Sequence, residues 1–186
     1  MNSSRKMMLT AALVAASASA FASDADAPGF WQTPALPGIG KMHPLPQAAY
    51  QPQPSATYRI VFAVTKGADQ PGEVNPSLSR VARTVNLYAS AGTPLDHLKF
   101  VAVLSGKATG AVLDNGHYKR LFGTDNPNLE IIHQLRAAGV DVAVCGQAVA
   151  ENQFDYGWIN REVTLSLSAL TTITVLETQG YVLMPL

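Results

Sequence analysis

GVDVAVCGQ, residues 139–147, is the stretch of this chain that decides the fold. Gly139 is typical of a helix end, residues 140–144 of a buried strand, and Gly146 and Gln147 of the start of a new helix. A strand-to-helix turn in an α/β domain exposes one side chain at the sheet edge and directs free backbone N–H groups towards it. Cys145 stands at this turn, where a thiol can be a nucleophile or a carrier.

The same alternation of apolar runs and amphipathic segments continues on both sides of this stretch, which is typical of a parallel sheet covered on both faces. We interpret Asn75 and Asn126, each followed by proline, as helix caps, and 114–116 as a turn. The pattern predicts a three-layer α/β/α domain over residues 57–186, flavodoxin-like in appearance, with a five-stranded, mainly parallel sheet. The predicted strands are 58–64, 98–104, 140–144, 163–165 and 181–184. The predicted helices follow Asn75 up to Gly92, lie near Ala111, span 118–122, follow Asn126 up to Gly139, and span 147–151 and 168–179, the last with Ala169, Leu170, Ile173 and Leu176 facing inward.

The first 22 residues are predicted to be a secretory signal peptide. Arg5 and Lys6 precede an apolar run over 7–16, and the small residues at 18–20 and 20–22 suit signal cleavage, which we expect after Ala22. A membrane anchor is the competing interpretation, but the run is shorter than the roughly 20 residues that a spanning helix needs. We therefore expect a periplasmic protein that is free of the membrane after cleavage.

Length and charge limit the classes of function. Cleavage would leave 186 − 22 = 164 residues, which suits one domain. The full chain has 13 basic and 13 acidic residues, and loss of Arg5 and Lys6 gives a mature charge of 11 − 13 = −2, with no basic patch that would indicate nucleic-acid binding. A single cysteine cannot form an internal disulfide, so Cys145 is a buried inert thiol, an intermolecular link or a reactive group.

Residues 23–56 form a proline-rich extension in front of the domain. Seven of the 12 prolines lie between positions 28 and 54, which favours extended or polyproline-like backbone. In one interpretation its apolar side chains dock onto the domain or onto a neighbouring subunit, and in the other the extension is a free tether. The side chains in question are Phe30, Trp31, Ile39 and Tyr50.

The order of these motifs resembles that of the DsrE/DsrF-like family, which includes the sulfur-relay subunits of the TusBCD and DsrEFH type. The resemblance covers about residues 57–186. It implies a domain that self-associates, commonly into trimers or hexamers, and a cysteine, here Cys145, that accepts sulfane sulfur as a persulfide and hands it on. The relay proteins are cytoplasmic, whereas this chain has an export signal and an extension. The motifs are the opening strand, RTVNLY at 83–88, KFVAV at 99–103, DNPNL at 125–129 and GVDVAVCGQ at 139–147.

The chemistry of a thiol at this turn agrees with that role. A thiolate is the reactive form of cysteine, and a helix N-terminus lowers the pKa of a cysteine, here through the backbone N–H groups near Gly146 and Gln147. Gly146 also lets backbone or substrate approach closely. The alternative is that Cys145 packs as a small apolar residue at the end of a buried strand.

Other strand ends should meet the same edge of the sheet, so the residues after the first two strands are candidate pocket lining. Lys66 would favour an anionic sulfur donor such as thiosulfate, and its alternative is a solvated loop lysine. Thr65 belongs to the same strand end. The candidate substrate-binding residues are Lys66, Ser105, Gly106, Gly146 and Gln147.

The remaining polar residues indicate no metal site and no cofactor. His117 is a candidate base or ion-pair partner for a thiolate, whereas His133 is expected to face solvent or an interface. Met42 and His43 have no partner cluster. The sequence has no Ser-His-Asp order, no metal-ligand spacing and no phosphate-binding glycine loop.

Two functions from different classes follow. In the first, this is a periplasmic sulfur-handling protein in which Cys145 carries persulfide between a donor and an acceptor protein. In the second, it is a non-catalytic oligomeric subunit that binds a ligand or partner, with Cys145 buried.

Overall fold

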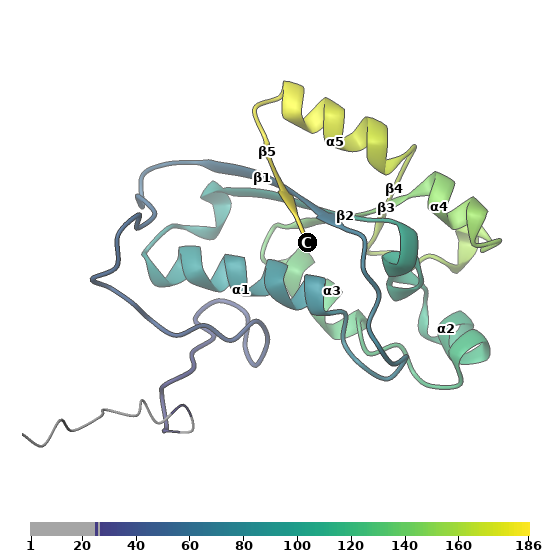
Figure 1. The fold of residues 1–186 in the computed structure, drawn as a ribbon, viewed down its shortest axis with the longest axis horizontal. Coiled ribbons are helices and arrows are strands. Elements are labelled where there is room, and N and C mark those ends of the chain that lie inside the picture. Colours follow the sequence, from purple (N-terminus) through teal and green to yellow (C-terminus); the bar gives the residue numbers. More distant parts are fainter. Residues whose placement is uncertain (1–24, 26) are drawn as a thin grey trace, which may run out of the picture.

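The computed structural model describes residues 25 and 27–186, and the predicted signal peptide lies outside the described residues. The chain forms a five-stranded sheet in the order β4-β3-β2-β1-β5. Every neighbouring pair of strands is parallel, which confirms the predicted α/β class (Figure 1). The strands are β1 (Tyr58–Val64), β2 (Leu98–Leu104), β3 (Asp141–Cys145), β4 (Thr164–Ser166) and β5 (Val182–Pro185).

Helices cover both faces of the sheet. In Figure 1, α1 and α3 lie below the sheet, α5 lies above it, and α2 and α4 lie beyond the carboxyl ends of the strands. Among the described residues, none of the helices combines the length and apolar content needed to cross a bilayer. The helices are α1 (Pro76–Ser90), α2 (Asn115–Phe122), α3 (Leu129–Ala137), α4 (Gly146–Glu151) and α5 (Ala169–Thr178), and the 3₁₀ helices are η1 (Leu95–His97), η2 (Gly106–Val112) and η3 (Tyr156–Trp158).

The two faces of the sheet are packed unequally. The main core lies between the sheet and the apolar faces of α1 and α3, where side chains such as Phe62 and Phe100 are fully buried. Under α5 the buried set contains only Val61, Val101 and Val103. The prediction that Leu170 faces inward is wrong, because its side chain is 80% exposed. Helix α5 is therefore held mainly by Ala169, Ile173 and Leu176, which pack against that small cluster.

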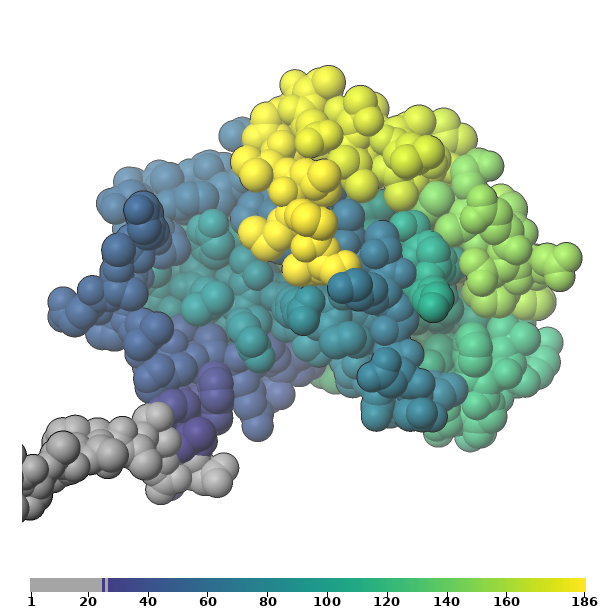
Figure 2. Space-filling view, viewed as in Figure 1, coloured from purple at the N-terminus to yellow at the C-terminus, as the bar shows by residue number. Residues whose placement is uncertain are grey.

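The proline-rich extension is docked, with its residues 32–42 closed into a loop by a β-bridge between Gln32 and Met42. The loop lies along α1 on the side away from the sheet, opposite to α5 (Figures 1 and 2). The buried Asn86 of α1 holds it through four hydrogen bonds, so this part of the extension is not a free tether, although Tyr50 further along is fully exposed. Asn86 Oδ1 accepts from the N–H groups of Ala35 (2.9 Å) and Leu36 (3.0 Å), and Asn86 Nδ2 donates to the carbonyls of Ile39 (2.8 Å) and Gly40 (3.0 Å).

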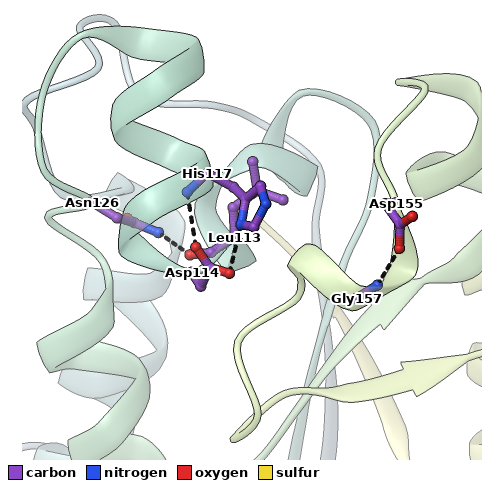
Figure 3. Close-up of polar contacts among 6 residues, drawn as sticks. All are labelled: Leu113, Asp114, His117, Asn126, Asp155 and Gly157. Carbon is purple, nitrogen blue, oxygen red and sulfur yellow. Dashed lines mark hydrogen bonds and ion pairs between the residues drawn. The ribbon is translucent and has the colours of Figure 1, made fainter.

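Two of the three interpreted caps and turns differ from the sequence analysis. Asn75 does cap α1 and accepts from the N–H groups of Ser77 and Leu78. Asn126, however, does not cap α3, whose N-cap position is Asn128. Asn126 Nδ2 donates to the carbonyl of Leu113 (Figure 3) and to that of Ala111, and its Oδ1 accepts from the N–H of Asn128.

The predicted turn at 114–116 is also wrong, because Asn115 and Gly116 are the first residues of α2. Asp114 accepts from the N–H of His117 at 2.8 Å and thereby caps the helix (Figure 3). An aspartate in front of an Asn-Gly pair suits a helix N-cap as well as a turn, so the local pattern alone is ambiguous. This hydrogen bond, despite partial burial and aided by the side chain of His117, lowers the pKa of Asp114.

Candidate functional site

Cys145 lies where β3 ends and α4 begins. It is the last residue of β3 and the N-cap of α4, and its Sγ accepts from the N–H of Ala148 at 3.4 Å. A sulfur in the N-cap position takes the role that a serine or aspartate oxygen has at many helices, because the first N–H groups of a helix lack partners within it. The sequence prediction of a thiol at a strand-to-helix turn therefore agrees with the geometry.

A second helix also begins at this sulfur. Strand β4 pairs with β3 so that Ser166 lies opposite Cys145, and the chain then enters α5 at Ala169. The N–H of Ala169 and the side chain of Ser168 lie close enough to the thiol to lower its pKa. Since β3 and β4 are parallel neighbours, the helices that follow them start at the same edge of the sheet. The sulfur consequently lies between the positive ends of two helix dipoles.

Burial and the neighbouring donors act in opposite directions on the pKa of Cys145. Burial raises the pKa of Cys145, but the N–H groups of Ala169, Ala148 and Gln147 and the side chain of Ser168 together outweigh it. The net effect is a pKa below the ordinary value for a cysteine. Hydrogen bonds from several donors stabilise the thiolate, which is the nucleophilic form.

The site is enclosed. Cys145 is 5% exposed, and Gly146 is buried beside it. A Cβ atom on Gly146 would lie 2.8 Å from the carbonyl oxygen of Ser166, so only glycine fits between α4 and the end of β4. The Tyr156 hydroxyl donates to the carbonyl of Gly146 at 3.2 Å and so lies next to the turn that holds Cys145.

The candidate substrate-binding residues separate into two groups. Gly146 and Gln147 adjoin Cys145, and the exposed Gln147 side chain donates to the carbonyl of Leu167 at 3.3 Å. Lys66, Ser105 and Gly106 lie at the ends of β1 and β2. Strand β2 stands between β1 and β3, so the lysine and the thiol come from strands that are not neighbours.

The second group is held mainly by backbone contacts. The N–H of Ser105 donates to the carbonyl of Val64 at 3.0 Å, and Gly106 has a positive φ of 55°. The Lys66 side chain is exposed, and the backbone carbonyl of Lys66 accepts from Asn75 Nδ2 at 2.7 Å. Lys66, Ser105 and Gly106 therefore lie at the carboxyl ends of β1 and β2, apart from the thiol at the end of β3.

Ser168, Ala169 and Tyr156 contact the Cys145 turn but were absent from the sequence-based candidates. The signal that could have found the first two is the order of the strands, because the helix start at Ser168 was recognised while its neighbour in space was not. Nothing in the local sequence around Tyr156 indicates its hydrogen bond to Gly146.

The histidines are occupied by other contacts. His117 Nδ1 lies 2.7 Å from Asp114 Oδ2, and its ring stacks on Trp158 at a centroid distance of 4.7 Å. His133 is exposed and pairs with Glu162 at 2.9 Å; the pKa of His133 is raised by that carboxylate. Residues 25 and 27–186 contain no group of three or more histidine, cysteine, aspartate or glutamate side chains that could hold a metal ion.

Together, the parallel sheet and the capped thiol define an α/β protein with one cysteine at the carboxyl end of a central strand. The family model for the DsrE/DsrF-like family matches residues 58–186, and the chain belongs to that family. No curated protein matches. A solved structure that is similar is that of the protein of unknown function MTH1491 from Methanobacterium thermoautotrophicum, with 16% identity, coverage of 69% of this chain and 99% of that chain, and a TM-score of 0.49.

Proposed function

We propose that this protein handles sulfur in the periplasm, with Cys145 accepting sulfane sulfur and passing it on as a persulfide. The observation that carries the proposal is the position of Sγ at the start of α4, where it accepts from the N–H of Ala148 at 3.4 Å and where the groups at the starts of α4 and α5 lower its pKa. Membership of the DsrE/DsrF-like family supports a role in sulfur relay.

The proposed reaction has two steps. The Cys145 thiolate attacks the outer sulfur of a donor such as thiosulfate; the new S–S bond forms as the old S–S bond breaks, and sulfite leaves with the bonding electron pair. The deprotonated Cys145 persulfide and sulfite together carry the same charge as the Cys145 thiolate and thiosulfate did before the reaction. In the second step an acceptor thiolate attacks the outer sulfur of the protonated persulfide, and Cys145 leaves as a thiolate.

The donors around Sγ would serve both steps. They favour the attacking thiolate in the first step and the leaving thiolate in the second, because the same hydrogen bonds stabilise the negative charge each time. Since Cys145 is enclosed, transfer requires the start of α5 to move away from α4. Only a small buried cluster lies between α5 and the sheet, so a movement of the start of this helix would disrupt little of the core.

We further propose that the protein is a homo-oligomer, a trimer or hexamer, and that a donor or acceptor protein docks on it. Support comes from large apolar side chains that are exposed on β4, α5 and β5 and on the loop between β4 and α5. Exposed apolar residues mark sites of protein association, and these lie on α5, on the loop before it and on the two edge strands that precede and follow it. The exposed side chains are Leu165, Leu167, Leu170, Val175, Val182 and Leu183.

The enclosure of Cys145 and the same apolar surface favour the second candidate, a non-catalytic oligomeric subunit. In that case the hydrogen bonds to Sγ only stabilise the turn between β3 and α4. The two candidates differ in whether the thiol reacts in the folded protein.

Incubation of the mature protein with thiosulfate or polysulfide is expected to add one sulfur atom, because the lowered pKa of Cys145 increases the fraction of the nucleophilic thiolate. Intact mass spectrometry would measure the gain, which a reductant should reverse. Cys145→Ser should take up no sulfur, while Thr109→Ser, a change of a buried hydroxyl elsewhere, should load as the wild type does. Absence of any gain with either donor would exclude the carrier role.

The rate of maleimide labelling is expected to rise with pH around a lower midpoint in the folded protein than in the denatured one, because the pKa of Cys145 is lowered by folding. By linkage, the thiolate stabilises the fold above the pKa of the unfolded thiol, and this contribution is lost as pH falls through the folded pKa. Stopped-flow labelling with and without denaturant checks the midpoints. A thiol that labels only after denaturation would support the non-catalytic subunit.

A further inference from the structure

A cavity of about 220 Å³ lies at the carboxyl ends of β1 and β2, away from Cys145. Its walls come from the loop after β1, from η2, from α2, and from the starts of α1 and α3. In parallel α/β sheets, ligands bind outside the carboxyl ends of the strands. The cavity is smaller than the roughly 300–1,000 Å³ typical of drug-sized ligands, so it suits a molecule with few non-hydrogen atoms.

The inner end of the cavity offers two hydrogen-bond donors that the protein does not use. Asn75 and Asn128 line the cavity and are 1% and 2% exposed. Asn75 Nδ2 donates to the carbonyl of Lys66, and Asn128 Nδ2 donates to Asn126 Oδ1. A side-chain amide carries two N–H groups, so each asparagine retains one without an acceptor among the described residues. Because both asparagines line the cavity, the second N–H of each amide is a donor that a ligand oxygen could use.

Two opposite charges lie in the lining. Lys107 extends from η2 and Asp69 from the loop after β1, and both are exposed. Neither forms an ion pair within residues 25 and 27–186. A ligand that carries both a positive and a negative group would complement this pair, whereas Asp69 disfavours a plain anion.

The remaining wall is apolar and fixed. The rings of Tyr118 and Phe122 lie 4.5 Å apart, and the Tyr118 hydroxyl donates to the carbonyl of Pro71 at 2.7 Å. This hydrogen bond joins α2 to the loop after β1. A Cβ atom on Gly110 would lie 3.3 Å from the Phe122 ring, so this ring packs closely against η2.

We propose that this cavity binds a small α-amino acid. Its carboxylate accepts from the free N–H groups of Asn75 and Asn128 and pairs with Lys107. Its ammonium group pairs with Asp69, and a short side chain contacts Tyr118 and Phe122. The site does not involve Cys145 and holds whether or not that thiol carries sulfur.

Titration of the ¹⁵N-labelled mature protein with L-serine or L-alanine is expected to shift the side-chain amide signals of Asn75 and Asn128, with saturation and a dissociation constant below about 1 mM. Acetate and ethylamine, which each carry one of the two charges, should bind at least about tenfold more weakly. The Cys145→Ser variant should bind like the wild type, which keeps this test independent of sulfur transfer.

Two substitutions assign the charges. Lys107→Gln should weaken serine binding by about tenfold or more, and Asp69→Asn should reduce serine to the affinity of acetate. Lys99→Gln, earlier on β2, and Asp96→Asn, in η1, are matched controls and should change nothing. No saturable shift up to about 10 mM serine or alanine, acetate binding as tight as serine, or undiminished binding in both lining variants would each overturn the amino-acid assignment.

Discussion

Replacement of Asn86 by alanine is expected to lower the free energy of unfolding by about 3–5 kcal/mol. The side chain is fully buried and makes all four hydrogen bonds that its amide can make, each to the backbone of the extension. Alanine would leave two N–H groups and two carbonyls facing a buried gap, and desolvated groups without partners are costly. Urea denaturation of the two proteins measures the difference.

The same substitution should release the extension. Limited proteolysis is expected to cut the Asn86→Ala protein within residues 27–56 at concentrations that leave the wild type intact, because an undocked proline-rich segment is open backbone. Asn152→Ala is the matched control, since that side chain makes one hydrogen bond, to the carbonyl of Ala148, at the surface end of α4. A stability loss for Asn86→Ala no larger than that of the control would show that the extension contributes little.

Replacement of Gly146 by alanine is expected to cost about 1–3 kcal/mol and to raise the pKa of Cys145. The added methyl group would meet the carbonyl oxygens of Ser166 at 2.8 Å and Leu167 at 3.4 Å, both backbone atoms. The end of β4 must then move outward, and it carries Ser168 and Ala169 away from the sulfur. Thermal unfolding measures the cost, and the pH midpoint of maleimide labelling measures the change in pKa.

Gly72→Ala is the control for this substitution, because a Cβ atom there has no neighbour within 4 Å and its φ is not positive. If Gly146→Ala unfolds like the control and labels with the wild-type midpoint, α4 and α5 have more freedom at this point than their contact indicates. If its labelling becomes faster at every pH without a change in midpoint, access rather than the lost hydrogen bonds dominates.

The sheet was predictable because its strands are short apolar runs bounded by polar residues and helix caps. β1 and β2 have the predicted bounds, and the other three strands differ by one residue at each end. The position of Cys145 at a helix start followed from the same local pattern. Local patterns also predicted the helix start at Ser168 but could not place it beside Cys145, since that proximity depends on which strand lies next to β3.

Three polar residues and one leucine show where sequence reasoning stops. Asn126 precedes a proline as a helix cap would, yet its amide group donates to two carbonyls in and after η2. A buried amide is most stable where its N–H groups find acceptors, and the local sequence does not show where those acceptors lie. Asn86 has helical neighbours on both sides and gives no sign of its bonds to residues some fifty positions earlier. Leu170 fits the apolar face of α5 in the sequence pattern, but that face has more apolar residues than the small cluster on the sheet can contact, and Leu170 stays exposed. Asp114 could begin a turn or a helix.

The docked loop also constrains the order in which the molecule assembles. Residues 32–42 leave the ribosome before α1 and α3, yet their hydrogen bonds are to Arg83 and Asn86 in α1 and to Gln134 in α3, the last 97 positions from its partner Pro37. Contacts between residues so far apart in the chain form slowly, because a long intervening segment must first be organised. The earliest described segment to be synthesised is thus expected to be among the last to reach its final place.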